Sequence, residues 1–228
     1  MRKVRDYYAV KAKKEQYPAR SIYKLEEVQQ KYRLLRPGDA VLDIGCFPGS
    51  WALFAGLAVG EKGLVVGVDL QQGRQAPRAG SAPIHWLRFD IREPDFLVAV
   101  KKIRPAFRAI LCDIAPKTTG NRWTDAQQSL RLVRTSLRLA ETLLLPGGHY
   151  LSKIFQGEDV PALLQELRRA FALVKVLKPR SSRAESREIF ILAMEYRGGE
   201  IIAPEDGASS DGLEDETGIA GTADGDNQ

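Results

Sequence analysis

Cysteine and histidine are scarce in this sequence, with two residues of each among 228. Cys46 and Cys112 cannot form the framework of a disulfide-stabilised domain. Together with two histidines they supply too few soft ligands for a structural zinc site. We therefore expect a chain without a bound metal, in a reducing, cytoplasmic compartment.

Long apolar runs are also missing. No stretch approaches the roughly 18 consecutive apolar residues of a membrane span. The N-terminal segment MRKVRDYYAVKAKK is basic and is not followed by apolar residues, unlike a secretory signal. Neither a heptad pattern nor an apolar patch is evident, so we expect a monomer without a membrane partner.

Basic residues are missing from the end of the chain. Residues 205–228 contain eight acidic residues and neither lysine nor arginine. Because this segment has few residues that could anchor a core, we predict a disordered acidic tail that follows one domain over residues 1–204. That domain then carries 34 basic and 21 acidic side chains, a formal net charge of +13. Such a charge favours a polyanionic partner, since neutralised phosphates release counterions.

Apolar segments of strand length alternate with segments of helical periodicity along the domain. Strands are predicted at 40–45, 63–70, 84–91, 109–116, 149–155, 173–179 and 188–196. Helices are predicted at 21–35, 51–59, 95–103 and 124–145, and another after the N-cap candidate Asp159, with Pro161 in its first turn. Strands separated by helices form parallel βαβ units, but the last two strands leave no room for a crossover helix. The sequence predicts an α/β fold with a doubly wound, mostly parallel seven-stranded sheet and an antiparallel edge hairpin.

The loop after the first strand lacks the glycine pattern of a dinucleotide site. It reads DIGCFPGSW, in which Phe47 and Pro48 stand where a pyrophosphate needs bare backbone. Asp69, at the end of the second strand, can accept hydrogen bonds from both hydroxyls of a ribose, and Asp90 on the third strand can reach an adenine edge. Each acid alone could merely cap a helix. Together with Asp43 on the first strand, they favour a nucleoside without a pyrophosphate, S-adenosylmethionine (AdoMet).

A lysine stands inside a strand that should be buried. Lys153 in YLSKIFQGE lies in an otherwise apolar segment, where its charge costs free energy unless it is paired or lost. Asp113 lies toward the end of the neighbouring fourth strand, so the two side chains can meet. The alternative is that Lys153 extends to the surface. Lys24 and Glu188 also adjoin apolar residues, and each alone would most often be a solvated charge.

Read together, these segments resemble one family. From about Asp6 to Tyr196 the chain is similar to the FtsJ/RrmJ-type ribose 2′-O-methyltransferases, which place a Lys-Asp-Lys-Glu tetrad on a class I, Rossmann-like AdoMet-binding fold. The tetrad falls on Lys24 in ARSIYKLEE, Asp113 in CDIAPKTTG, Lys153 in LSKIFQGE and Glu188 in SSRAESREIF. The resemblance implies that Lys153 is the proton acceptor. It also implies that AdoMet is bound by Gly49, Trp51, Asp69, Asp90 and Asp113.

The glycine loop departs from the family pattern. It usually reads A-A-P-G-G-W, but here Cys46, Phe47 and Ser50 are substituted, and Lys117 stands where asparagine is common. Ser50 reduces backbone freedom and Phe47 can narrow the cofactor mouth, while Lys117 can contact a phosphate or be solvated. All four tetrad residues are retained, so we expect an active enzyme.

The resemblance and the charge together imply an RNA substrate and no DNA partner. The compact form, without an added RNA-binding module, is similar to the bacterial type that methylates a uridine of 23S rRNA in the large ribosomal subunit. Basic and aromatic side chains suited to phosphates and unstacked bases are Arg2, Lys3, Arg5, Tyr7, Tyr8, Lys11, Lys13, Lys14, Tyr17, Arg20, Lys178, Arg180, Arg183 and Arg187.

Three alternatives remain at this point. A transfer RNA anticodon-loop methyltransferase would use the same tetrad. A non-catalytic RNA-binding or ribosome assembly factor would have no need for a strand lysine among carboxylates. A small-molecule methyltransferase is disfavoured by the charge of the domain.

Overall fold

A computed structural model describes residues 7–182 and 185–202. The predicted acidic tail at 205–228 lies outside the described residues. The same holds for four of the basic residues suggested for RNA binding, namely Arg2, Lys3, Arg5 and Arg183.

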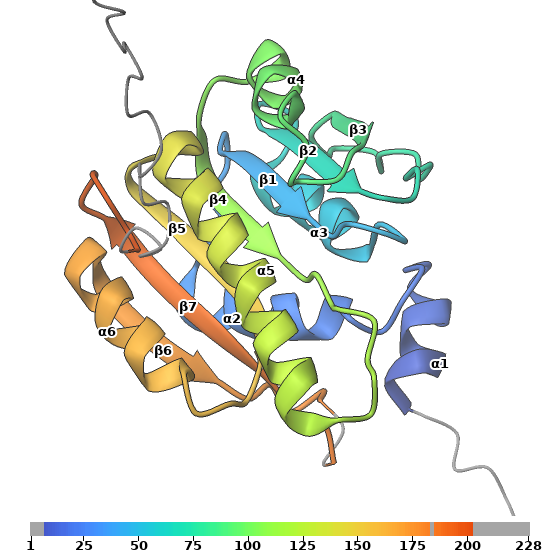
Figure 1. Ribbon diagram of the computed structural model, residues 1–228. Helices are drawn as coiled ribbons and strands as arrows, with labels where there is room; N and C mark the ends of the chain where they lie inside the picture. Colours follow the sequence, from blue (N-terminus) through green and yellow to red (C-terminus); the bar gives the residue numbers. More distant parts are fainter. Residues whose placement is uncertain (1–6, 183–184, 203–228) are drawn as a thin grey trace, which may run out of the picture.

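The described residues form one seven-stranded sheet with the order β3-β2-β1-β4-β5-β7-β6 (Figure 1). Its strands are β1 (Ala40–Ile44), β2 (Leu64–Asp69), β3 (Ile84–Arg88), β4 (Phe107–Cys112), β5 (Leu144–Phe155), β6 (Phe171–Leu177) and β7 (Glu188–Tyr196). The first five strands are mutually parallel, and β7 is antiparallel to both β5 and β6. The prediction of a doubly wound sheet with an antiparallel edge hairpin is confirmed. The hairpin folds back so that β7 lies between β5 and β6.

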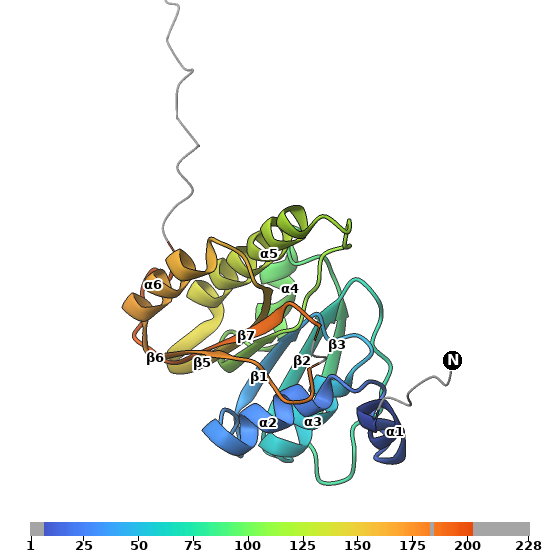
Figure 2. The same ribbon diagram turned by 90° about the horizontal axis from the view of Figure 1, so that it is seen from below.

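Helices cover both faces of the sheet (Figure 2). They are α1 (Tyr7–Lys14), α2 (Ile22–Tyr32), α3 (Ser50–Val59), α4 (Phe96–Ile103), α5 (Arg122–Leu143) and α6 (Val160–Ala170). Apolar residues of α4, α5 and α6 pack in one core cluster, and those of α2 and α3 pack in a second cluster on the opposite face. Among the described residues, no helix is both long and apolar enough to cross a membrane.

Helix α1 was not predicted, because its basic sequence shows almost no apolar periodicity. Only Ala12 is buried in it, against Ile22 and Tyr23 of α2. Tyr8 adds a ring contact to Tyr23, with a centroid separation of 5.4 Å. Tertiary contacts with α2 therefore hold a segment that has little tendency of its own to form a helix.

Several predicted boundaries were wrong: β3 ends at Arg88 and β4 at Cys112, before the predicted residues 91 and 116. Two other differences have identifiable local reasons. Helix α2 ends at Tyr32 rather than at residue 35, because Arg33 adopts a left-handed conformation with φ 51°. Strand β5 begins at Leu144, before the Pro-Gly-Gly sequence expected to precede it. The register jumps from Phe107 opposite Leu144 to Ala109 opposite His149, so a bulge absorbs the Pro-Gly-Gly sequence within the strand.

Asp159 occupies the expected N-cap position of α6, and Pro161 lies in the first turn, but the Asp159 side chain makes no capping hydrogen bond. Its Oδ2 instead accepts a hydrogen bond from Gln127 Nε2 on α5. The carboxylate therefore connects two helices.

Ser50 joins the start of α3 to the segment before α2. The backbone N–H of Ala19 donates to Ser50 Oγ at 2.8 Å, and the Ser50 hydroxyl donates to the Ala19 carbonyl at 3.1 Å. Ser50 is 1% exposed, so this pair of bonds is shielded from water. The substitution that departs from the family pattern thus has a structural role: it fixes the segment leading to Lys24.

We predict that Ser50→Ala lowers the free energy of unfolding by about 1–3 kcal/mol, because it leaves the N–H and carbonyl of Ala19 without this partner. Urea denaturation measures the change. Thr135→Ala, which removes one exposed bond from Oγ1 to the Arg131 carbonyl, is the matched control and should have a smaller effect. Equal stability of the Ser50→Ala variant and the unmodified chain would contradict this role.

Candidate active site

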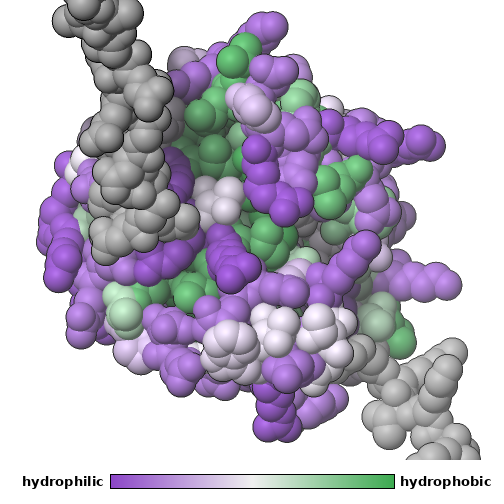
Figure 3. Space-filling view, viewed as in Figure 1, coloured by the Kyte–Doolittle hydropathy of each residue, from purple (hydrophilic) through white to green (hydrophobic). Residues whose placement is uncertain are grey.

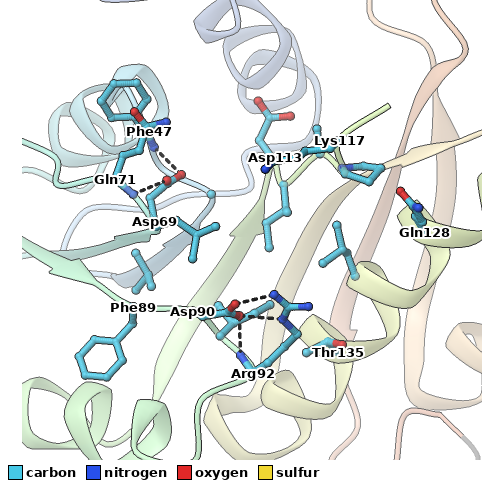
Figure 4. A pocket seen from close by; sticks show the side chains of 18 of the residues that line it. Phe47, Asp69, Gln71, Phe89, Asp90, Arg92, Asp113, Lys117, Gln128 and Thr135 are labelled. Carbon is cyan, nitrogen blue, oxygen red and sulfur yellow. Dashed lines mark hydrogen bonds and ion pairs between the residues drawn. The ribbon is translucent and has the colours of Figure 1, made fainter. Parts of the chain in front are cut away.

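The site lies where the parallel strands end. A cavity of about 870 Å³ opens beyond the carboxyl ends of β1, β2, β3 and β4 and is closed on one side by α5 (Figure 4). Asp69, Asp90 and Asp113 line it, whereas Asp43, the third acid of the predicted nucleoside site, does not. On the face shown in Figure 3, apolar side chains gather near the hollowed middle of a mostly hydrophilic surface.

Gly45 provides the bare backbone in this cavity. Its φ is +79°, and a Cβ at this position would lie 2.9 Å from both Cγ1 and the backbone nitrogen of Ile114. The predicted cofactor residue Gly49 starts α3 with φ +113°, and a Cβ there would approach Gln75 Cγ to 2.9 Å. Gly45 lines the cavity and Gly49 does not. Gly45, the first glycine of the loop, is thus a better candidate for a cofactor contact than Gly49.

Asp69 is oriented by two backbone groups. Its Oδ2 accepts a hydrogen bond from Phe47 N at 3.1 Å, and its Oδ1 accepts one from Gln71 N at 2.9 Å (Figure 4). A carboxylate oxygen can accept more than one hydrogen bond, so both oxygens retain capacity for a diol. Phe47 is 45% exposed and also lines the cavity, which agrees with its predicted place at the mouth.

Asp90 is already engaged by a residue that the sequence reasoning missed. Arg92 donates to its Oδ1 from Nε at 2.9 Å and to its Oδ2 from Nη2 at 2.6 Å. The hydrogen bonds from this guanidinium lower the pKa of Asp90 despite partial burial. The signal was present in RFDIRE, where an arginine follows the acid by two residues. An adenine amino group at Asp90 would share the carboxylate with Arg92.

Trp51, predicted to contact the cofactor, lies in the core rather than along the cavity. It is 3% exposed, and its Nε1 donates to the Ser21 carbonyl at 2.8 Å. Its ring packs against Phe190, with a centroid separation of 6.0 Å. Trp51 therefore positions the start of α2, which carries Lys24, and a contact with AdoMet stays a prediction.

The structure brings Lys153 and Asp113 together. Lys153 Nζ lies 2.9 Å from Asp113 Oδ1 and donates to the Asp113 carbonyl at 2.8 Å. In the parallel register of β4 and β5, Cys112 lies beside Ser152. The residues that follow them, Asp113 and Lys153, therefore lie side by side at the same edge of the sheet. Lys153 is 5% exposed and does not extend to the surface.

Lys24 and Glu188 form the second ion pair, with Nζ and Oε2 2.7 Å apart. Burial raises the pKa of Glu188, but the positive charges of Lys24 and Lys153 and the Lys24 hydrogen bond outweigh it and hold that pKa below its usual value. Because Lys153 acts on Glu188 in this way, the two ion pairs are electrostatically coupled. All four members of the predicted tetrad thus lie in one charged cluster.

This cluster separates two hollows. Asp113 lines the large cavity, which is also lined by Lys117. Lys24 and Glu188 line a smaller hollow of about 400 Å³ between the start of α2 and the segment before β7, together with Arg20, Ser21, Ser182, Glu185 and Ser186. One molecule can therefore approach the ion pairs from each side.

Asp43 is a buried carboxyl group behind this cluster. It is 0% exposed, on β1. Burial raises its pKa well above the usual value, and the carboxylates of Asp113 and Asp69 raise it further, while a backbone hydrogen bond from Ala52 opposes them. The folded chain therefore holds a proton on Asp43 under conditions in which an exposed aspartate would have lost it.

We predict that Asp43→Asn becomes relatively more stabilising as pH rises. Above the usual value near 3.8, the unfolded chain releases the proton that the folded chain keeps, so the contribution of Asp43 to stability falls until its raised pKa is reached. The variant cannot titrate at this position. The free energy of unfolding of the variant minus that of the unmodified chain should increase as the pH rises above about 4 in urea denaturation series. A difference that is independent of pH would contradict the buried, protonated state, and Asp95→Asn on the surface is the control.

Comparisons with known proteins agree with this geometry. Residues 17–196 match the family model described as FtsJ-like methyltransferase. The ribosomal RNA large subunit methyltransferase E of Desulfotalea psychrophila is 58% identical over 197 residues, which covers 86% of this chain and 98% of that protein. The protein of the same name from Syntrophobacter fumaroxidans is 43% identical over 194 residues, covering 85% and 97%.

Solved structures share the fold. A ribosomal RNA methyltransferase from Plasmodium falciparum superposes with a TM-score of 0.69 at 27% identity, over 80% of this chain and all of that one. Fibrillarin from Aeropyrum pernix, solved with natively bound S-adenosyl-L-methionine, has a TM-score of 0.53 at 18% identity, over 76% of each chain, a likeness of fold alone. On the family model and the extent of identity with its relatives, this chain belongs to the FtsJ-like methyltransferase family.

Proposed function

We propose that this chain transfers a methyl group from AdoMet to a ribose 2′-hydroxyl of ribosomal RNA, at a uridine of 23S rRNA in the large subunit. The observation that carries the proposal is the charged cluster of Lys24, Asp113, Lys153 and Glu188 between two hollows. Family membership and the names of the relatives support the reaction class and the RNA.

The residues of the large cavity fit AdoMet. The sulfonium compound supplies an electrophilic methyl group. Asp69 would hold the ribose hydroxyls, and Asp90 with Arg92 would meet the adenine edge. Phe89 and Ile91 offer apolar surface to the ring, and Gly45 lines the cavity without a side chain because Ile114 occupies the place of a Cβ.

The acceptor ribose would enter the smaller hollow. The deprotonated form of Lys153 would take the proton of the 2′-hydroxyl onto Nζ as the new O–C bond forms and the S–C bond breaks. Asp113 fixes the direction of that amine through its carboxylate and its carbonyl oxygen. Lys24 is the ion-pair partner of Glu188, with Nζ 2.7 Å from Oε2. Asp113 is then the direct partner of Lys153. Alignment of the reacting atoms supplies the rest of the acceleration.

The proposal is tested by incubating the protein with labelled AdoMet and total RNA and mapping the methylated nucleotide. Label in a ribose of large-subunit rRNA is the expected result. Label in transfer RNA would assign the chain to the anticodon-loop alternative. Label in protein or small molecules, with none in RNA, would overturn the proposal.

We predict that Lys153→Ala lowers methyl transfer by about 10²–10⁴-fold, the usual contribution of a general base. Binding of AdoMet, measured by calorimetry, should be retained because Lys153 does not line the large cavity. Lys153→Arg should fail similarly, since a guanidinium does not deprotonate in proteins. Lys101→Ala on the surface of α4 is the control. Transfer at the unmodified rate by Lys153→Ala would show that the base is another group.

The structure describes part of the basic surface suggested for RNA binding. Lys13 and Lys14 are exposed in the last turn of α1. Lys178 and Arg187 are instead used within the fold: Lys178 Nζ donates to the Glu188 carbonyl at 3.0 Å, and Arg187 Nη1 donates to the Arg122 carbonyl at 3.1 Å. The end of α1 is thus a better candidate for phosphate contact.

We predict that removing both lysines from the end of α1, in a Lys13→Ala and Lys14→Ala double variant, reduces the slope of log K for RNA against log salt by about 2. Filter binding over a salt series measures the slope. The matched control is the pair Lys101→Ala and Lys102→Ala, which occupies the last turn of α4. An unchanged slope in the α1 variant would remove this helix from the RNA surface.

A further inference from the structure

Trp123 is an exposed aromatic residue with no role in the fold core. The chain has three tryptophans. Trp51 is buried and Trp86 is partly buried, whereas Trp123 is 63% exposed, in the first turn of α5. An exposed indole offers a large flat apolar face with a polar N–H at its edge, a combination suited to binding.

The indole is held in one orientation. Its Nε1 donates to Glu158 Oε1 at 3.1 Å, which anchors the ring to the loop after β5. The helix start beneath it is capped, because Asn121 Oδ1 accepts a hydrogen bond from Thr124 N at 3.0 Å. The exposed face is therefore already oriented, and binding to it would cost little side-chain entropy.

The same turn is joined to the segment that carries a tetrad residue. Arg187, which immediately precedes Glu188, donates to the Arg122 carbonyl at 3.1 Å and places Nη2 3.7 Å from Asp125 Oδ2. The start of α5 accordingly lies beside the chain leading into β7 (Figure 1). The first turn of α5 is thus tied to the loop after β5 and to the segment before β7, next to the strands that contain Lys153 and Glu188.

Helix α5 presents different faces to the two sides of the site. Gln128 and Arg131 line the large cavity. Trp123 and Gln127, one turn apart, face the loop after β5, where they bond to Glu158 and Asp159. Trp123 and Gln128 are only about 7–8 Å apart along the helix axis. Trp123 therefore faces the loop after β5 and does not line the AdoMet cavity. That loop is itself joined to the segment before Glu188, because Gln156 N donates to the Arg187 carbonyl at 3.0 Å.

The chemistry at this position suits an unpaired nucleobase. A flat aromatic face stacks on any base, because every base has a π-face. Resting on the function proposed above, we propose that Trp123 stacks on an unpaired base next to the nucleotide whose ribose is methylated. It is then a substrate-positioning residue, which contributes to RNA affinity and not to the methyl transfer step.

The first test follows tryptophan emission during titration with the RNA fraction that accepts methyl groups. Stacking should quench the emission of the unmodified chain. The quenching should be lost in Trp123→Phe, in which Trp51 and Trp86 remain as internal references. Inorganic polyphosphate, which offers charge without bases, should leave the emission unchanged. Equal quenching by polyphosphate, or full quenching in Trp123→Phe, would overturn the proposal.

The second test separates affinity from chemistry. Trp123→Ala should raise the KM for RNA about tenfold, within the usual range for one base–aromatic stack, while kcat and the Kd for AdoMet stay the same. Trp123→Phe should recover most of the loss, because a phenyl ring also stacks. Val98→Ala, at a 54% exposed position on α4, is the control.

The outcomes distinguish this proposal from the function on which it rests. If the unmodified chain methylates RNA and Trp123→Ala has an unchanged KM, the stacking role alone is wrong. A fall in kcat at constant KM, or no recovery in Trp123→Phe, would assign Trp123 to support of the Glu158 and Arg187 contacts and would overturn stacking. If the unmodified chain transfers no methyl group to RNA, the proposed function itself fails.

Discussion

The arrangement depends on a buried lysine that cannot remain unpaired. A charged amine with 5% exposure is costly to desolvate, and only an adjacent carboxylate with good geometry offsets that cost. The parallel register of β4 and β5 supplies this partner, because Asp113 and Lys153 directly follow the aligned residues Cys112 and Ser152. The pair is therefore a consequence of strand alignment, and a shift of one residue would direct Lys153 to the other face of the sheet.

The second ion pair requires the reversal of β7. Because β7 runs antiparallel to β5, its first residue lies at the carboxyl end of β5, with Glu188 opposite Phe155. A parallel seventh strand would have placed its start at the far edge, away from the ligand side of the sheet. Lys24 comes from a helix that precedes the sheet entirely, so it needs separate anchors. Trp51 and Ser50 provide them through bonds to the backbone at Ser21 and Ala19.

Much of the fold and of the candidate site could be predicted from sequence, because the most informative residues are polar side chains within or directly after apolar strands. A lysine in an apolar strand and acids at successive strand ends are visible without a structure. The sheet brings Lys153, Asp69 and Asp90 to the expected edge, whereas Asp43 is buried in β1. Contacts between distant segments were not visible. The burial of Trp51 depends on α2 and β7 together, and the extension of β5 through Pro146 depends on a bulge opposite β4. Helix α1 exists through contacts with α2, and its sequence alone contains no periodicity that would predict it.

The net positive charge that would attract RNA lies outside the tetrad at which methyl transfer is proposed. The tetrad contains two cations and two anions, so its centre is close to neutral, whereas the body of the chain carries the net positive charge. A polyanion would thus be attracted by the rim, at positions such as the end of α1, and would not be held at the reacting centre itself. A neutral centre also avoids stabilising phosphate at the place where a sugar hydroxyl has to be positioned. Positioning must then come from the shape of the smaller hollow and from uncharged contacts, such as the aromatic face at the start of α5.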